Sequence, residues 1–146
     1  MKAELKHSGK MKLDTQIGGF SITMDADAPF GEGQHPSPKQ LLLTGMAGCT
    51  AMDVISLLKK HKQAFESFSM KVNAESVKTY PQVFNECLME YFAEGPVDAR
   101  ILNESVQLSL SKYCSVSAMV SKVVPIQWKT YINSQMVGEG KAEFNF

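Results

Sequence analysis

The sequence has no excess of charge of either sign, and this absence argues against one broad class of partner. Its 15 lysine and arginine residues balance 15 aspartate and glutamate residues, so the formal net charge is zero. Nucleic-acid-binding proteins normally carry a basic excess that neutralises phosphates. We therefore expect no nucleic-acid partner.

The sequence also lacks an apolar run of the kind that a signal peptide or a membrane span requires. Residues 1–7 contain no apolar core, and no stretch approaches the roughly 20 apolar residues that cross a bilayer. The 146 residues are 44% hydrophobic and 21% charged, which is typical of one soluble globular domain. We expect a single domain over residues 1–146, a cytoplasmic location and no membrane partner.

Short motifs for metal binding and for serine hydrolysis are missing as well. The three cysteines and three histidines form no Cys-x-x-Cys or His-x-x-x-His pair, so we expect no metal site and no cofactor. The nucleophile elbow Gly-x-Ser-x-Gly is absent. Three cysteines in a cytoplasmic chain favour thiol chemistry or simple burial over a disulfide framework.

The apolar periodicity predicts short strands and three helices along the chain, an α+β arrangement. Turn residues and a loop at 26–37 separate these segments. We expect strands at 2–6, 11–17, 20–25, 68–78, 83–94, 126–133 and 136–144, and helices from Pro38 to about Lys60 and at roughly 97–112 and 114–122.

The helix that begins at Pro38 is the clearest element. Ser37 is a suitable N-cap, and Gln40 stands three residues after it, as in a capping box. Apolar side chains then cover nearly every side as far as Lys60, so we expect the helix to be buried all round. One chain of this size can hardly surround it, which implies a partner subunit.

Two cysteines stand out by their positions. Cys49 lies in the middle of the long helix near Gly45 and Gly48, and each glycine costs about 1 kcal/mol there relative to alanine. Close helix packing or access of a small substrate to the sulfur would compensate; alternatively, Cys49 is a small buried hydrophobe. Cys114 begins a predicted short helix near Lys112, which on local physics favours a lowered thiol pKa.

The third cysteine, Cys87, falls in a strand pattern with no polar cluster nearby. We therefore expect it to belong to the core.

Two blocks of sequence resemble the OsmC/Ohr superfamily. The run from Gly33 to Leu43 (GQHPSPKQLLL), followed by Ala47 to Val54 (AGCTAMDV), is similar to the central-helix motif of these proteins. The run from Leu110 to Ser117 (LSKYCSVS) is similar to their second-cysteine motif. The order and spacing of the blocks extend the resemblance over essentially the whole chain.

The resemblance implies an OsmC-like fold, in which antiparallel sheets wrap a long buried central helix in an intertwined homodimer. It also implies a redox-active role in the oxidative stress response. Cys49 would attack an organic hydroperoxide to give a sulfenic acid, and Cys114 would resolve it as a disulfide that an external thiol reduces.

The sequence departs from the Ohr subgroup at two positions. These peroxidases carry an arginine after a Gly-Gly pair, where this chain has Phe20, and a glutamate where it has Lys39. The single arginine, Arg100, belongs to another segment. We expect Lys39 to supply the positive charge near Cys49 and His35 to act as a nearby base; the alternative is that both are solvated.

Three functions remain open at this point. The first is a thiol-dependent peroxide reductase acting through Cys49 and Cys114. The second is a dimer of the same fold that binds or senses a small apolar or electrophilic molecule in an interface pocket. The third is a structural dimer in which the cysteines are only packed.

Overall fold

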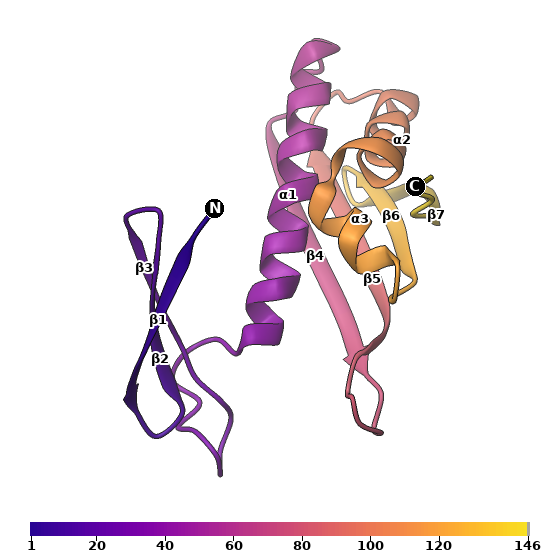
Figure 1. Cartoon of the computed structure of the whole chain (residues 1–146). Helices are drawn as coiled ribbons and strands as arrows, with labels where there is room; N and C mark the ends of the chain where they lie inside the picture. Colours follow the sequence, from indigo (N-terminus) through magenta and orange to yellow (C-terminus); the bar gives the residue numbers. More distant parts are fainter. Residues whose placement is uncertain (146) are drawn as a thin grey trace. The chain divides into compact units, whose positions relative to one another are not determined.

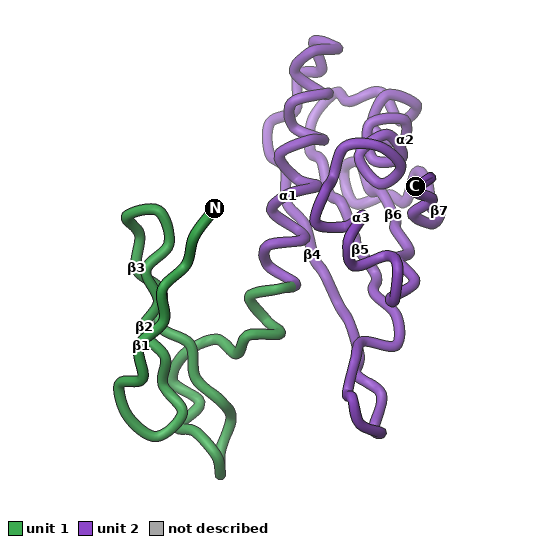
Figure 2. Tube along the Cα trace, viewed as in Figure 1, with its two compact units in different colours: residues 1–42 green, residues 43–146 purple. Residues whose placement is uncertain are grey.

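The computed structural model describes residues 1–145, which form a mixed α+β fold with two sheets (Figure 1). Contacts divide the chain into two compact units: an N-terminal unit, Met1–Leu42, and a C-terminal unit, Leu43–Phe146 (Figure 2). The boundary falls within the long helix α1, Pro38–Lys60.

The three strands predicted near the start of the chain form an antiparallel sheet in the order β1-β2-β3. The strands are β1 (Ala3–Gly9), β2 (Lys12–Ile17) and β3 (Phe20–Met24). Gly18 and Gly19 both have positive φ, +54° and +88°, in the two-residue turn between β2 and β3. Glycine adopts this conformation without strain, and such turns match the twist of a hairpin.

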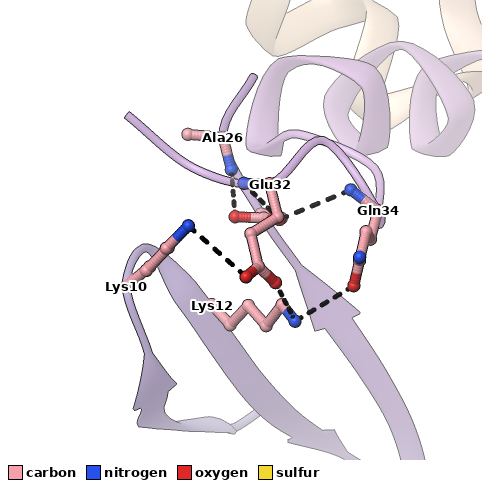
Figure 3. Close-up of polar contacts among 6 residues, drawn as sticks. Lys10, Lys12, Ala26, Glu32 and Gln34 are labelled. Carbon is pink, nitrogen blue, oxygen red and sulfur yellow. Dashed lines mark hydrogen bonds and ion pairs between the residues drawn. The ribbon is translucent and has the colours of Figure 1, made fainter. Parts of the chain in front are cut away.

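The loop after β3 is organised around the buried carboxylate of Asp25. Figure 3 shows the neighbouring Ala26, Glu32 and Gln34 of this loop, with Lys10 and Lys12. The Asp25 carboxylate accepts hydrogen bonds from the backbone N–H groups of Ala26, Glu32 and Gln34, at 2.8, 3.1 and 3.4 Å. Lys12 pairs with Glu32 and donates to the Gln34 side chain at 3.1 Å. Polar contacts therefore order a segment that has few apolar residues to bury.

Helix α1 begins where the capping box predicts. The backbone N–H of Ser37 donates to Gln40 Oε1 at 2.8 Å, and the N–H of Gln40 donates to Ser37 Oγ at 3.4 Å. Within the single chain, however, the helix buries one stripe, not every side; its buried residues are Met46, Thr50, Val54 and Leu58.

The prediction that no segment is long and apolar enough to cross a membrane was wrong for α1. Its 23 residues include a window of mean hydropathy 1.7, of which 28% is buried in the chain. This match rests on length and composition alone, and the core helix of a soluble protein has the same properties. Most of the apolar surface of α1 is therefore not covered within the single chain.

The C-terminal unit is built on a four-stranded sheet in the order β4-β5-β6-β7. Its strands are β4 (Ser67–Ser76), β5 (Phe84–Glu94), β6 (Ile126–Ile132) and β7 (Gln135–Lys141). The expectation of purely antiparallel sheets was wrong here, because β5 and β6 pair in parallel. The helices between them form a crossover connection, which returns the chain to the end of the sheet where β5 began.

The predicted helix at 97–112 is two elements. Helix α2, Ala99–Leu108, is followed by a π-helix, η1, at Ser109–Tyr113, and then by α3, Ser115–Ser121. The wider turn of a π-helix has no signature in the apolar periodicity, and π-helical turns are frequent at functional sites.

The core of the C-terminal unit lies between its helices and its sheet. Alternate residues of β5 point into it, as the strand period requires: Cys87, Met89, Tyr91 and Ala93 are all at most 1% exposed. The prediction that Cys87 is a core residue is confirmed, and burial raises its pKa to about 11. The core therefore forms a rigid support for the segments that carry the other two cysteines.

Candidate functional site

Helix α1 places Cys49 and Asp53 on one face, since residues four positions apart lie one turn above each other. Both side chains are half-buried in the single chain. Thr50, between them in sequence, is fully buried and anchors this part of the helix to the core.

Cys114 ends the π-helix and caps the next helix. Its backbone is extended (φ −69°, ψ 95°), and its sulfur accepts a hydrogen bond from the N–H of Ser117 at 3.4 Å. Sγ also lies 3.0 Å from Ser117 Oγ, in a second hydrogen bond. The cysteine is completely buried, and these contacts hold its sulfur in one orientation.

The fold brings these residues together. The Sγ atoms of Cys49 and Cys114 and a carboxylate oxygen of Asp53 all lie within 4.8 Å of one another. Both cysteines are free thiols. Two thiols and a carboxylate thus form one cluster, although they come from segments far apart in the sequence.

Asp53 is the member of this cluster that was not predicted as a site residue. Its place in the sequence block after Cys49 gave no chemical role by itself. The available signal was its spacing: a carboxylate four residues after a helical cysteine must lie beside it.

A chain of hydrogen bonds runs from this cluster into the core. Ser109 Oγ donates to Asp53 Oδ2 at 2.9 Å and lies 2.8 Å from Thr50 Oγ1. Thr50 Oγ1 in turn lies 2.8 Å from the hydroxyl of Tyr91. The first residue of the π-helix is therefore the link between Asp53 and the buried polar groups.

The expected lowering of the Cys114 pKa was wrong. Burial raises the pKa of this thiol, hydrogen bonds with Ser117 oppose the rise, and a hydrogen bond with Cys49 adds to it, so that the pKa is about 11. Lys112 lies over the ring of Tyr113, 5.5 Å from its centre. Loss of hydration outweighs a short helix N-terminus, so Cys114 keeps its proton at neutral pH.

Lys39 and His35 lie in the N-terminal unit, outside the unit that contains the cysteine cluster, and both are exposed. Hydrogen bonds from Thr23 and Ser8 lower the pKa of Asp14, and the charge of His35 lowers it slightly further. His35 thus acts on the β1-β2-β3 sheet in this structure. The proposed roles of Lys39 and His35 toward Cys49 stay predictions.

Arg100 lies on the exposed surface of α2 and not in the cysteine cluster. Its Nη1 contacts both carboxylate oxygens of Glu104, at 3.1 and 3.2 Å. This is an ordinary pair at i and i+4 on a helix surface.

A shallow pocket of about 290 Å³ opens beside the cluster. Asp53 and Tyr113 form part of its wall, together with Leu57 and Lys60. The pocket combines apolar surface with one cation and one carboxylate, so a small amphipathic molecule fits its chemistry.

The cluster also contains three potential metal ligands, despite the absence of a short metal-binding motif. Spacing along the chain detects only ligands from one local segment. Here two come from α1 and one from the start of α3, which spacing could not reveal.

Comparison with known proteins gave consistent matches. The family model described as OsmC-like protein matches residues 31–129. Protein YhfA of Escherichia coli is 33% identical over 129 residues, which cover 86% of this chain and 93% of YhfA.

Solved structures share the fold. A hypothetical protein from Aquifex aeolicus aligns with a TM-score of 0.81 and 27% identity, over 90% of this chain and 95% of its own. An organic hydroperoxide resistance protein, OsmC, from Legionella pneumophila aligns with a TM-score of 0.64 and 19% identity, over 90% and 94%.

Proposed function

Because the chain belongs to the OsmC-like protein family, we propose that it is a thiol-dependent reductase of organic hydroperoxides. The observation that carries the proposal is the meeting of Cys49 and Cys114 at the Asp53 carboxylate. Two thiols whose sulfurs lie within 4.8 Å of each other form a disulfide once they approach to about 2.05 Å. The solved relative described as a hydroperoxide resistance protein supports the choice of substrate.

In the first step, the Cys49 thiolate attacks the outer oxygen of the hydroperoxide. The S–O bond forms, the O–O bond breaks, and the alkoxide leaves as the alcohol after taking a proton. Cys49 is then a sulfenic acid, oxidised by two electrons.

In the second step, the Cys114 sulfur attacks the Cys49 sulfur. The S–S bond forms, the S–O bond breaks, and the hydroxide leaves as water with the proton from Cys114. Asp53 is placed to accept that proton from Cys114 and to pass it to the leaving hydroxide, because its carboxylate lies within 4.8 Å of both sulfurs. Two equivalents of an external thiol then reduce the disulfide.

The environments of the two sulfurs support this division of roles. Cys49 is half-buried, whereas Cys114 is fully buried and has a pKa of about 11. A protonated, buried thiol is poorly suited to attack peroxide from solvent. A hydroperoxide therefore reacts with Cys49 first, and Cys114 reacts afterwards with the oxidised Cys49.

The uncovered surface of the chain supports an intertwined homodimer with α1 at its centre. Met52 on α1 is 73% exposed, and Met119 on α3 is 66% exposed. Added Cβ atoms at Gly45 and Gly48 would meet nothing within 4 Å in the single chain. A second copy packed on this face would cover the glycines and close the site around Cys49.

The dimer has a direct test in sedimentation equilibrium. The reduced protein is expected to sediment with twice the chain mass, and Met52→Asp to shift it toward the monomer because a charge would be buried. A wild-type monomer at micromolar concentration would contradict the proposal.

A second candidate function is the binding or sensing of a small apolar or electrophilic molecule at the same pocket. The position of Arg100 favours it, since the only arginine of the chain is paired with Glu104 on α2 and not with Cys49. Under this alternative, Cys49→Ser retains ligand binding although the thiol is gone.

Titration of the reduced protein with cumene hydroperoxide separates the two functions. We expect loss of two thiols per chain, and a Cys49–Cys114 disulfide in the peptide map. Cys49→Ser should abolish the reaction, Cys114→Ser should stop at the sulfenic acid, and Cys87→Ala should react as the wild type does. Survival of both thiols in excess peroxide would refute the reductase.

A further inference from the structure

The cluster of Cys49, Asp53 and Cys114 has a donor set that the proposed redox chemistry does not fully use. Two sulfurs and a carboxylate oxygen lie within 4.8 Å of one another. We propose that these three groups bind one Zn²⁺ ion in the reduced protein.

The three ligand atoms lie near enough to one another for side-chain rotations to bring them around one tetrahedral ion. Zinc binds thiolate at about 2.3 Å and carboxylate oxygen at about 2.0–2.2 Å, so its ligands lie roughly 3.3–3.8 Å apart. Side-chain rotations of Cys49 and Asp53 can close the remaining distance, because both side chains are only half-buried. The fourth position is left to water or to a small thiol.

The surroundings already orient the ligands, as outer groups do in zinc sites. Ser109 donates to Oδ2 of Asp53 and leaves Oδ1 for the ion. Ser117 holds Sγ of Cys114 through two contacts. Thr50 contacts Ser109 from the core side. Ser109 and Ser117, the two serines that contact the ligands, are both buried.

The donor types select the class of ion. Calcium and magnesium take oxygen ligands almost exclusively, whereas two thiolates with one carboxylate suit a borderline-soft divalent cation. Zinc does not change its redox state, so the ion would hold both sulfurs as thiolates without oxidising them. The zinc-bound form would also keep Cys49 and Cys114 from joining as a disulfide.

The inference is independent of the proposed peroxide chemistry. Asp53 is required for the ion, whereas the disulfide requires only the two sulfurs. A protein that binds zinc but ignores peroxide would refute the reductase alone, and the opposite result would refute the zinc site alone.

The test is an anaerobic titration of the reduced full-length protein with Zn²⁺ against a chromogenic chelator. We expect one ion per chain. Asp53→Asn should weaken binding by at least the 10–100-fold that loss of an outer-shell partner costs, and Ser109→Ala by on the order of 10-fold. Glu75→Gln, which changes an exposed carboxylate on β4, is the matched control and should bind as the wild type does.

Co²⁺ provides a direct readout of the sulfurs in the same preparation. Sulfur-to-cobalt charge-transfer bands are expected in the wild type and in Cys87→Ala, and their loss is expected in Cys114→Ser. The nearly isosteric Asp53→Asn keeps the test decisive if a cysteine variant fails to fold. Absence of binding by the folded wild type, or equal affinity in Asp53→Asn and Glu75→Gln, would overturn the proposal.

Discussion

The C-terminal unit carries its own hydrophobic core, whereas the N-terminal unit is ordered mainly by polar contacts. Every member of the core cluster belongs to residues 43–146. In the N-terminal unit, the large apolar side chains of Leu5, Phe20 and Phe30 are exposed by 54%, 77% and 79% in the single chain. Its loop is held by the buried Asp25 carboxylate instead.

This contrast explains why the cysteine cluster lies in the C-terminal unit. A buried core provides fixed positions for Cys114 and for the hydrogen-bond chain that ends at Asp53. Exposed apolar side chains such as those of Leu5 and Phe20 are suited to contact with another surface. Under the proposed function, we therefore expect the C-terminal unit to set the reactivity of the thiols and the N-terminal unit to depend on the second subunit of the proposed dimer.

The largest effect is expected from Leu102→Ala on α2. Leu102 is completely buried, and loss of a buried leucine side chain costs about 2–5 kcal/mol of unfolding free energy. Urea denaturation measures this cost. Leu5→Ala in the N-terminal unit is the matched change and should cost at most about 0.5 kcal/mol when both variants are measured in protein diluted until it is monomeric. An equal loss in both variants would break the contrast between the units.

A smaller effect is expected from Tyr91→Phe. The change removes the hydroxyl that Thr50 contacts at 2.8 Å, and such a hydrogen bond contributes about 0.5–1.5 kcal/mol. Tyr80 is 90% exposed, so Tyr80→Phe is the control with no expected change in denaturation midpoint. Unchanged stability of Tyr91→Phe would show that the hydrogen-bond chain is not part of the core.

The next effect concerns the loop after β3, whose stabilisation by Asp25 depends on pH. Burial acts to raise the pKa of Asp25, but the N–H donors of Ala26, Glu32 and Gln34 outweigh it and hold the pKa below the usual value of 3.8. Because the folded pKa is lowered, the stabilisation is complete above that usual value and is lost as the pH falls through the folded pKa.

Hydrogen exchange of the Glu32 and Gln34 backbone amides measures this loss of stabilisation, because both amides donate to Asp25. Asp25→Asn should expose both amides to exchange at neutral pH, where the wild type protects them. Asp27→Asn in the same loop changes an exposed residue and should leave exchange unaltered. Equal protection in Asp25→Asn and wild type would show that the loop is ordered by something other than the carboxylate.

The smallest effect is expected from Arg100→Gln. The exposed pair with Glu104 contributes within about 0.5 kcal/mol to stability. The rate of thiol loss in hydroperoxide should not change, since Arg100 lies on α2 and away from the cysteine cluster. A slower reaction would show that the single arginine serves the site after all.

Much of the fold follows from local rules. The strand period located β1 to β7 to within a few residues, and the pairing of Ser37 with Gln40 located the start of α1. The parallel pairing of β5 with β6 did not follow, because strand direction depends on the path of the chain between them.

The sequence by itself determined that the chain has the two cysteine blocks of its family and where the helices and strands begin. Those features depend on neighbouring residues and on side-chain periods, which a linear sequence contains. The tertiary structure alone decided that Asp53 joins Cys49 and Cys114, because α1 and the start of α3 meet only after folding. It also decided the raised pKa of Cys114, because burial and not the local helix end controls the hydration of that thiol.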